Sequence, residues 1–187
     1  ITYLSLSGNL SKVQRISLNK QWQGRKLLDY RNSIYGNIAV TKEKEQYTFF
    51  YNGIPIITTP YPDKQFVQDF GHLPLLFHQA PKDILIVSTG AGGLINEILK
   101  HPIEKLDYAE LDPLIIEMLK KYPTALSEAE LKERRVNIIN LDGRFFLKTN
   151  LKQYDLVLIG MSNQADLSTN RFFTQEFFSL VKKRLNS

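Results

Sequence analysis

Short runs of hydrophobic residues alternate with helix-like segments along the second half of the chain. The run Ile84–Val87 is continuously apolar, which is typical of a strand buried on both faces of a sheet. Three further runs predict strands at residues 105–111, 135–140 and 154–159. Segments with apolar residues at helical spacing predict helices at residues 94–100, 113–121 and 172–185. Strands that alternate with helices predict βαβ units and therefore an α/β fold with a parallel sheet.

A strand-rich stretch precedes this α/β pattern. Residues Gly36–Thr41 alternate weakly between apolar and polar side chains, and Gln46–Tyr51 is rich in β-branched and aromatic residues. The dipeptide Asn52-Gly53 is typical of a tight hairpin turn, and Ile54–Thr59 follows it as a third strand. These features predict a small antiparallel β-unit.

Two aspartates are placed to begin helices. Asp63 precedes a segment, Lys64–Gln79, whose apolar residues recur at helical spacing, and Pro74 inside this segment predicts a kink or a break. Asp112 is followed by Pro113, an arrangement that favours an N-cap followed by the first helical residue.

The charge of the chain is unevenly distributed. The 24 basic and 19 acidic residues give a net charge of +5. Residues 1–32 carry six bases and one acid, so residues 33–187 are balanced. We therefore expect a basic leader or linker (1–32) ahead of the N-terminal antiparallel β-unit (33–62) and the α/β domain (63–187). The balanced globular part argues against a nucleic-acid-binding face, and the leader is equally compatible with a solvated tail.

The composition excludes several classes of site. The chain has no cysteine, so disulfides, zinc–thiolate sites and cysteine nucleophiles are absent. The three histidines are scattered, and we expect no metal cofactor. No apolar run approaches the roughly 18 residues that a membrane span needs, and no secretory signal pattern is present. The chain begins at Ile1, from which we expect a piece of a longer or processed protein.

A glycine-rich turn is the first candidate for ligand binding. Gly90, Gly92 and Gly93 lie between the first predicted parallel strand and a helix, where glycines allow a ligand close to the backbone and the helix start offers free N–H groups. Glu110 ends the next strand, 20 residues after Gly90. A carboxylate there is suited to the two hydroxyls of a ribose, although an ordinary strand-end acid is the alternative.

A second candidate follows the third parallel strand. Asp142 and Gly143 lie where an adenine-contacting loop is expected in a nucleoside-binding sheet, and a simple turn aspartate is the alternative. All of these candidates fall at the carboxyl ends of parallel strands, where open α/β sheets bind their ligands. No catalytic residue is assigned.

Several segments, in order and with good spacing, carry a family resemblance. They read SIYGNIAV, YNGIPIITTP, HLPLL, ILIVSTGAGGLINEILKHPIEK, LDYAELDPLIIEMLKKY, RVNIINLDGRFFLK, YDLVLIG and NRFFTQEFFSLVKKRL. Together they resemble spermidine synthases, and most closely the bacterial branch in which such a domain is fused to membrane segments. The resemblance implies a Rossmann-like parallel sheet of the class I S-adenosylmethionine-dependent methyltransferase type after a small antiparallel β-unit. It also implies a nucleoside ligand: S-adenosylmethionine, its decarboxylated form or methylthioadenosine.

The chain departs from the family pattern at five places. Ala91 stands where the family has an aspartate that holds the amine of the decarboxylated nucleoside, and Gly160 stands where it has a catalytic aspartate. Asn163 replaces a further aspartate, Phe66-Val67 replaces a Tyr-His pair, and Gly36 replaces a glutamine. The nucleoside half of the site is retained, whereas the carboxylates that bind and deprotonate a cationic polyamine are missing. Asp166 is a nearby acid that is able to substitute only if its loop folds inward.

Three functional hypotheses follow. The first is a spermidine-synthase-like domain that keeps nucleoside binding but is doubtful as a spermidine synthase. The second is a transferase that uses S-adenosylmethionine on another substrate. The third is a non-catalytic interaction or sensor module on the cytoplasmic side of an inner-membrane protein, with membrane contact only through flanking segments. A basic leader near a membrane would fit the positive-inside rule.

The resemblance implies that residues 63–187 form an incomplete nucleoside-binding domain, whose sheet ends early at its C-terminal side. The resemblance implies a further parallel strand after the last helix, whereas the sequence ends at Ser187. The fourth parallel strand is then an edge, and an exposed apolar edge favours pairing with another chain, which makes a homo-oligomer a reasonable expectation.

Overall fold

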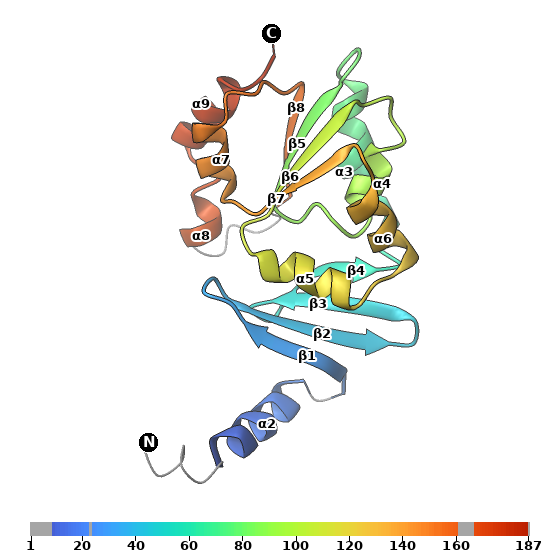
Figure 1. Ribbon diagram of the computed structural model, residues 1–187, viewed down its shortest axis with the longest axis vertical. Coiled ribbons are helices and arrows are strands. Elements are labelled where there is room, and N and C mark those ends of the chain that lie inside the picture. Colours follow the sequence, from blue (N-terminus) through green and yellow to red (C-terminus); the bar gives the residue numbers. More distant parts are fainter. Residues whose placement is uncertain (1–8, 23, 161–166, 187) are drawn as a thin grey trace.

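The computed structural model describes residues 9–22, 24–160 and 167–186. Two sheets with helices around them form the protein (Figure 1). One sheet is antiparallel, with strand order β1-β2-β3-β4, and the other is parallel, with order β7-β6-β5-β8. A parallel sheet preceded by a small antiparallel sheet is the α/β fold that the sequence predicts, and this prediction is confirmed.

The antiparallel sheet begins earlier than expected. Its strands are β1 (Lys26–Asn32), β2 (Asn37–Glu43), β3 (Gln46–Tyr51) and β4 (Ile54–Thr59). The predicted hairpin turn joins β3 to β4, and both of its residues have positive φ, 49° at Asn52 and 80° at Gly53. Strand β1 lies within the stretch assigned above to the leader, so the leader boundary at residue 32 falls at the end of a strand that pairs with β2.

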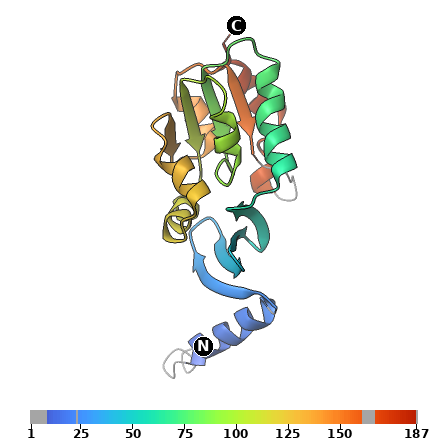
Figure 2. The same cartoon turned by 90° about the vertical axis from the view of Figure 1, so that its right-hand side faces the viewer.

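Hydrophobic clusters of buried residues surround the parallel sheet. Its strands are β5 (Asp83–Val87), β6 (Lys105–Ala109), β7 (Val136–Ile139) and β8 (Leu156–Ile159). Residues Ile84–Val87 are almost completely buried. This agrees with the continuous apolar run, because helices cover both faces of the sheet (Figure 2). Leu75 and Ile95 pack on one face, and Leu147 and Phe177 pack on the other.

Three helices confirm predicted segments. Helix α3 (Lys64–Leu76) is capped by Asp63, whose carboxylate accepts the N–H of Phe66, and Pro74 lies in its last turn. Helix α4 (Leu94–Ile98) follows the glycine turn, and α5 (Pro113–Lys121) is capped by Asp112.

Other helices were missed or differ in extent. Helix α6 (Ala125–Lys132) and helix α7 (Gly143–Thr149) fall in stretches where we predicted no element. The predicted helix at residues 172–185 is shorter, as α9 (Gln175–Lys182), and the short helix α8 (Leu167–Asn170) precedes it.

Helix α5 joins the two sheets into one core. It lies between them (Figure 1), and its residues Ile115 and Ile116 share a hydrophobic cluster with Ile38 and Phe49 of the antiparallel sheet. The Ser33 hydroxyl also donates to the Asp112 carboxylate, at 2.5 Å. The antiparallel sheet is therefore fixed against the carboxyl end of the parallel sheet, where ligands bind in this type of fold.

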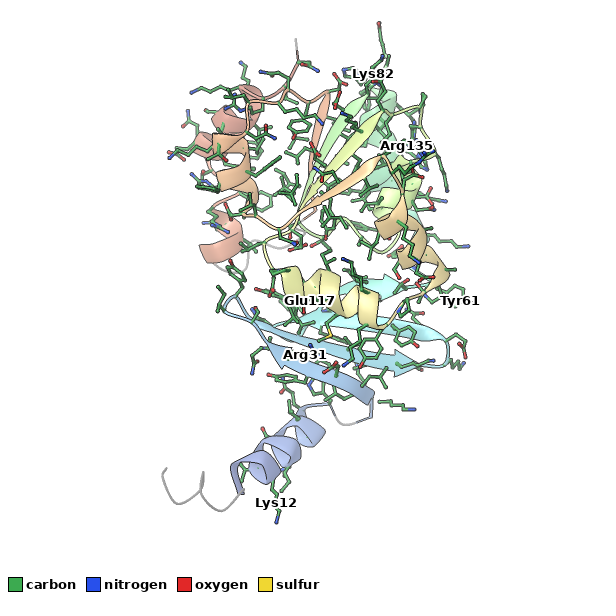
Figure 3. The ribbon with its side chains drawn as sticks, in the orientation of Figure 1. Lys12, Arg31, Tyr61, Lys82, Glu117 and Arg135 are labelled. Atoms are coloured by element: carbon green, nitrogen blue, oxygen red, sulfur yellow. The ribbon has the colours of Figure 1, made fainter. Side chains whose placement is uncertain are left out.

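The leader forms a helix, α2 (Asn9–Gln21), at one end of the molecule (Figure 1). Trp22, at the end of this helix, is buried against Phe50, and the guanidinium of Arg25 lies 5.0 Å from the centre of the Phe50 ring. Lys12 points away from the rest of the molecule (Figure 3). In the part of the chain that the structure describes, no helix combines the length and apolar character needed to cross a membrane.

Candidate nucleoside site at the glycine turn

The turn between β5 and α4 has an unusual backbone. Gly92 and Gly93 have φ angles of 93° and 117°, which glycine adopts freely. Ser88 and Thr89 also have positive φ, 63° and 50°, although they carry side chains. A left-handed conformation costs a non-glycine residue roughly 1–2 kcal/mol, so the surrounding structure holds this turn in place against a local strain.

The glycines allow the turn to lie close to its neighbours. A Cβ atom at Gly90 would lie 2.9 Å from the ring of Tyr108, and one at Gly92 would lie 2.7 Å from the side chain of Ile57 in β4. Such distances are shorter than real contacts allow. The predicted glycine residues therefore serve close packing of the turn against both sheets.

A carboxylate of the protein itself accepts hydrogen bonds from the backbone N–H groups at the start of α4. The N–H groups of Gly92 and Gly93 each donate to Glu130 of helix α6, at 2.7 Å, and the N–H of Asn96 donates to the same carboxylate at 3.1 Å. Glu130 is fully buried, and this burial raises its pKa although the three hydrogen bonds oppose the shift. The free N–H groups that the sequence predicts at this helix start are thus already satisfied.

Glu110 lies beside the turn, as predicted, and it also has partners within the protein. The Tyr108 hydroxyl donates to its Oε2 atom at 2.8 Å, and the N–H of Thr89 donates to the same atom at 3.2 Å. Glu110 is only 3% exposed, and burial raises its pKa. Burial and the adjacent charge of Glu110 raise the pKa of Tyr108 as well, so Tyr108 stays a hydrogen-bond donor.

Asp142 and Gly143 follow β7 at the same edge of the sheet. The Oδ1 atom of Asp142 caps helix α7 by accepting the N–H of Phe145, and Oδ2 forms an ion pair with Arg171 at 2.5 Å. A Cβ atom at Gly143 would overlap the side chain of Val87, so this glycine allows α7 to pack on β5. Both residues have clear structural roles.

A cavity of about 160 Å³ opens above the glycine turn, between β4 and α3. It is lined by Pro55, Ile56, Ile57, Thr58, Pro62, Asp63, Phe66, Val67, Phe70, Thr89, Ala91, Gly92, Leu94 and Gly160. The lining is mainly apolar, and Asp63 is the one charged residue among these described residues. A larger hollow of about 540 Å³ lies on the outer side of α3 and shares Asp63, Phe66 and Phe70 with the cavity.

Comparisons with known proteins show the family to which the chain belongs. A family model described as the spermine/spermidine synthase domain matches residues 64–187, about two thirds of the chain. The chain belongs to the spermine/spermidine synthase family. The resemblance to spermidine synthases is therefore confirmed at the level of the family.

Curated relatives are polyamine aminopropyltransferases. The chain is 34% identical to the one from Methanocaldococcus jannaschii over 116 residues, which cover 62% of this chain and 39% of the relative. It is 30% identical to the one from Leptospira interrogans over 155 residues (81% and 31%), and 27% identical to the one from Bacillus cytotoxicus over 179 residues (95% and 60%). The chain thus spans at most 60% of the length of these relatives.

Two solved structures share the fold. A spermidine synthase in complex with the transition-state analogue AdoDATO superposes with a TM-score of 0.76 at 24% identity, covering 86% of this chain and 55% of that one. The spermidine synthase from Thermotoga maritima gives a TM-score of 0.73 at 24% identity, covering 86% and 53%.

Two of the positions singled out in the sequence leave no room for a side chain in this structure. A Cβ atom at Gly160 would overlap the carbonyl oxygen of Ser88, so the turn and a side chain at 160 compete for the same space. A Cβ atom at Gly36 would lie 2.9 Å from the hydroxyl of Tyr51. Ala91 is buried in the cavity wall, 5% exposed. Asn163 and Asp166 lie outside the described residues.

Sequence reasoning missed two residues of the site. Tyr108 lies two positions before Glu110, and this spacing puts both side chains on one face of a strand, so the contact was readable. Glu130 lies 38 residues from Gly92, in a helix that we did not predict. Thr124 is the N-cap of that helix, and a threonine is a preferred N-cap residue, so it was the available signal.

Proposed function

We propose that this domain binds the nucleoside of an aminopropyl-transfer reaction, either decarboxylated S-adenosylmethionine or methylthioadenosine. The observation that carries the proposal is the cavity above the glycine turn, where the lining residue Thr89 donates its N–H to the buried Glu110 carboxylate at the end of β6. Family membership supports the same ligand class, because the curated relatives are aminopropyltransferases.

The size of the cavity suits part of such a ligand. A volume of about 160 Å³ is below the roughly 300–1,000 Å³ typical of pockets for whole ligands. It accommodates the propylamine or methylthio group, so the adenosine would lie along the carboxyl edge of the parallel sheet. Glu110 would then accept the ribose hydroxyls in place of the Thr89 N–H, whose hydrogen bond is the longer of the two at 3.2 Å.

We further propose that aminopropyl transfer by this domain is slow. The reaction needs a group that takes a proton from the attacking amine, and positioned acid–base groups contribute typically about 10²–10⁴-fold to rates. Gly160 has no room for a side chain, and Asp63 is the single acid among the described residues that line the cavity. We therefore expect transfer at least about 100-fold slower than in a family member with an aspartate at that position.

Calorimetry and a transfer assay test both parts of the proposal. Titration with methylthioadenosine and with decarboxylated S-adenosylmethionine should give saturable binding to one site. The variant Ala91→Leu should abolish binding by filling the cavity, while Ala80→Leu, the same change at an exposed position, should not. Absence of binding to either nucleoside contradicts the proposal, and product formation at the rate of a family enzyme contradicts its second part.

We also propose that the basic stretch at residues 1–32 lies near an anionic membrane surface. The support is its charge, six bases against one acid, in a chain whose other residues are balanced. Under this proposal, segments that flank this domain would hold a longer parent protein at the membrane.

A further inference from the structure

A filled anion site beside a cavity wall that lacks basic side chains among its described residues suggests which ligands the domain excludes. Consecutive backbone N–H groups in a glycine turn commonly form a nest that binds phosphate or carboxylate. Here the N–H groups of Gly92, Gly93 and Asn96 all point to Glu130 instead. Because Glu130 is fully buried, solvent and ligands do not reach this carboxylate directly.

One of these three donors, Gly92, borders the proposed binding cavity. Gly92 lines the cavity and donates to Glu130 at 2.7 Å, so the carboxylate lies directly behind the cavity wall. Asp63 adds a second carboxylate to the wall, and no lysine, arginine or histidine is found among the described residues that line it. A ligand anion placed here would meet no free N–H of the turn and would be repelled by two carboxylates.

We propose that Glu130 is a specificity-determining residue that makes this cavity select nucleosides with a neutral or cationic 5′ group and reject those with a 5′ phosphate or carboxylate. This inference rests on the proposed function, because it concerns the same cavity. It extends the proposed function by assigning the choice between 5′ groups to the Glu130 carboxylate on α6, which lies outside the glycine turn and outside the cavity lining.

Helix α6 is anchored so that Glu130 stays in place. The hydroxyl groups of Thr59, at the end of β4, and Thr124, the N-cap of α6, form a hydrogen bond at 2.5 Å. The hydroxyl and backbone of Ser127 close the capping box with Thr124. The Thr59–Thr124 hydrogen bond thus holds two features in place: the part of the cavity wall that β4 contributes, and the Glu130 carboxylate behind the glycine turn.

The test compares two ligands that differ at the 5′ position. Methylthioadenosine carries a neutral group, and adenosine 5′-monophosphate carries an anionic one. We expect the wild type to bind the monophosphate at least about tenfold more weakly than methylthioadenosine. The variant Glu130→Gln should reduce this gap by about tenfold, mainly by improving binding of the monophosphate. Glu128→Gln is the matched control, because Glu128 is an exposed residue of the same helix that pairs with Lys132.

The outcomes separate this inference from the proposed function. If the wild type binds neither ligand, the proposed function fails. If it binds methylthioadenosine and the gap in folded Glu130→Gln equals that of the wild type, the inference fails while the proposed function stands. If Glu130→Gln does not fold, amide hydrogen exchange of the wild type decides. Protection of Gly92, Gly93 and Asn96 without ligand supports the filled nest, and protection that appears only with the monophosphate overturns it.

Discussion

Ser88, Thr89 and Gly160 form one steric unit at the entrance to the glycine turn. The N–H of Gly160 donates to the carbonyl of Val87 at 2.9 Å, which places Gly160 directly beside the turn. Ser88 and Thr89 adopt positive φ there, and the Ser88 carbonyl fills the space that a Cβ at position 160 would need. An acidic side chain at 160 and this turn conformation are therefore mutually exclusive.

The variant Gly160→Asp should for this reason destabilise the protein and leave transfer slow. Forcing atoms into a packed site typically costs about 1–3 kcal/mol, which urea denaturation would detect as a lower free energy of unfolding. Ser88→Gly should recover part of the loss, because glycine tolerates positive φ and lets the turn move. A Gly160→Asp protein as stable as the wild type, with faster aminopropyl transfer, would show that this steric account is wrong.

Asp63 offers a residue-level test of the charge in the cavity. Asn is as good an N-cap as Asp, so Asp63→Asn should keep helix α3 and change the free energy of unfolding by less than about 0.5 kcal/mol. It should weaken binding of cationic decarboxylated S-adenosylmethionine while leaving neutral methylthioadenosine unaffected, as measured by calorimetry. Asp69→Asn, in the outer hollow of the same helix, is the control. An equal loss for both ligands would contradict an electrostatic role for Asp63.

At the scale of elements, a small polar cluster joins helices α3 and α4 behind the glycine turn. His72 contacts His101 through ring nitrogens 2.7 Å apart, and its other nitrogen lies 2.8 Å from Glu97. Although burial raises the pKa of Glu97, hydrogen bonds from Lys100 and His72 hold it below its ordinary value. Burial, together with the charge of His72, lowers the pKa of His101.

This junction should weaken in mild acid. A histidine whose pKa is lowered by folding takes up its proton more readily when unfolded, so stability is lost as the pH falls below the ordinary histidine value of 6.5. We expect the thermal midpoint to drop between pH 7.5 and pH 5.5. His101→Gln should reduce that drop, and His78→Gln, at an exposed position, should not. A drop of equal size in the two variants would exclude His101 as its source.

The parts of the fold that sequence reasoning found are those with local signals. The buried run of β5, the Asn52-Gly53 turn and the Asp112 cap each specify their element within a few residues. Strand β1 was missed because its pattern of side chains is only partly buried, and its partner in β2 provides the stabilising contacts. Helix α6 was missed because its apolar face is weak and its buried residues include Ser127 and Glu130.

The same distinction applies to the site. The position of Glu110 at the end of β6 follows from the strand pattern, and its place beside the turn was predictable. The filling of the backbone N–H nest by Glu130 was not predictable, because Glu130 and Gly92 lie 38 positions apart in the sequence. The part played by Asp142 also depends on a distant partner, Arg171, which local sequence does not reveal.

At the scale of the whole molecule, the excess positive charge lies at one end. Helix α2 extends from the antiparallel sheet at the opposite side from the parallel sheet (Figure 2). Val13 and Ile16 are exposed on this helix, 57% and 64%, next to exposed Lys12 and Lys20. Apolar and basic side chains together are suited to an anionic lipid surface.

Binding to lipid vesicles tests whether helix α2 contacts an anionic lipid surface. The protein should sediment with vesicles that contain phosphatidylserine and remain in solution with pure phosphatidylcholine, and salt should reverse binding. Each base near such a surface contributes about 1 kcal/mol, so Lys12→Glu with Lys20→Glu should reduce sedimentation strongly. The matched pair Lys182→Glu with Lys183→Glu, exposed at the end of α9, should have no effect. Equal loss in both pairs would assign binding to net charge alone.

The most direct test of the central claim is a nuclear magnetic resonance titration of the labelled protein with methylthioadenosine. If the nucleoside binds above the glycine turn, amide signals of Thr89, Ala91, Val67 and Glu110 should shift together and saturate with one binding constant. Signals of the distant helix α2 should stay unchanged. Saturable shifts confined to other parts of the molecule, or no shifts at millimolar ligand, would contradict a nucleoside site at this turn.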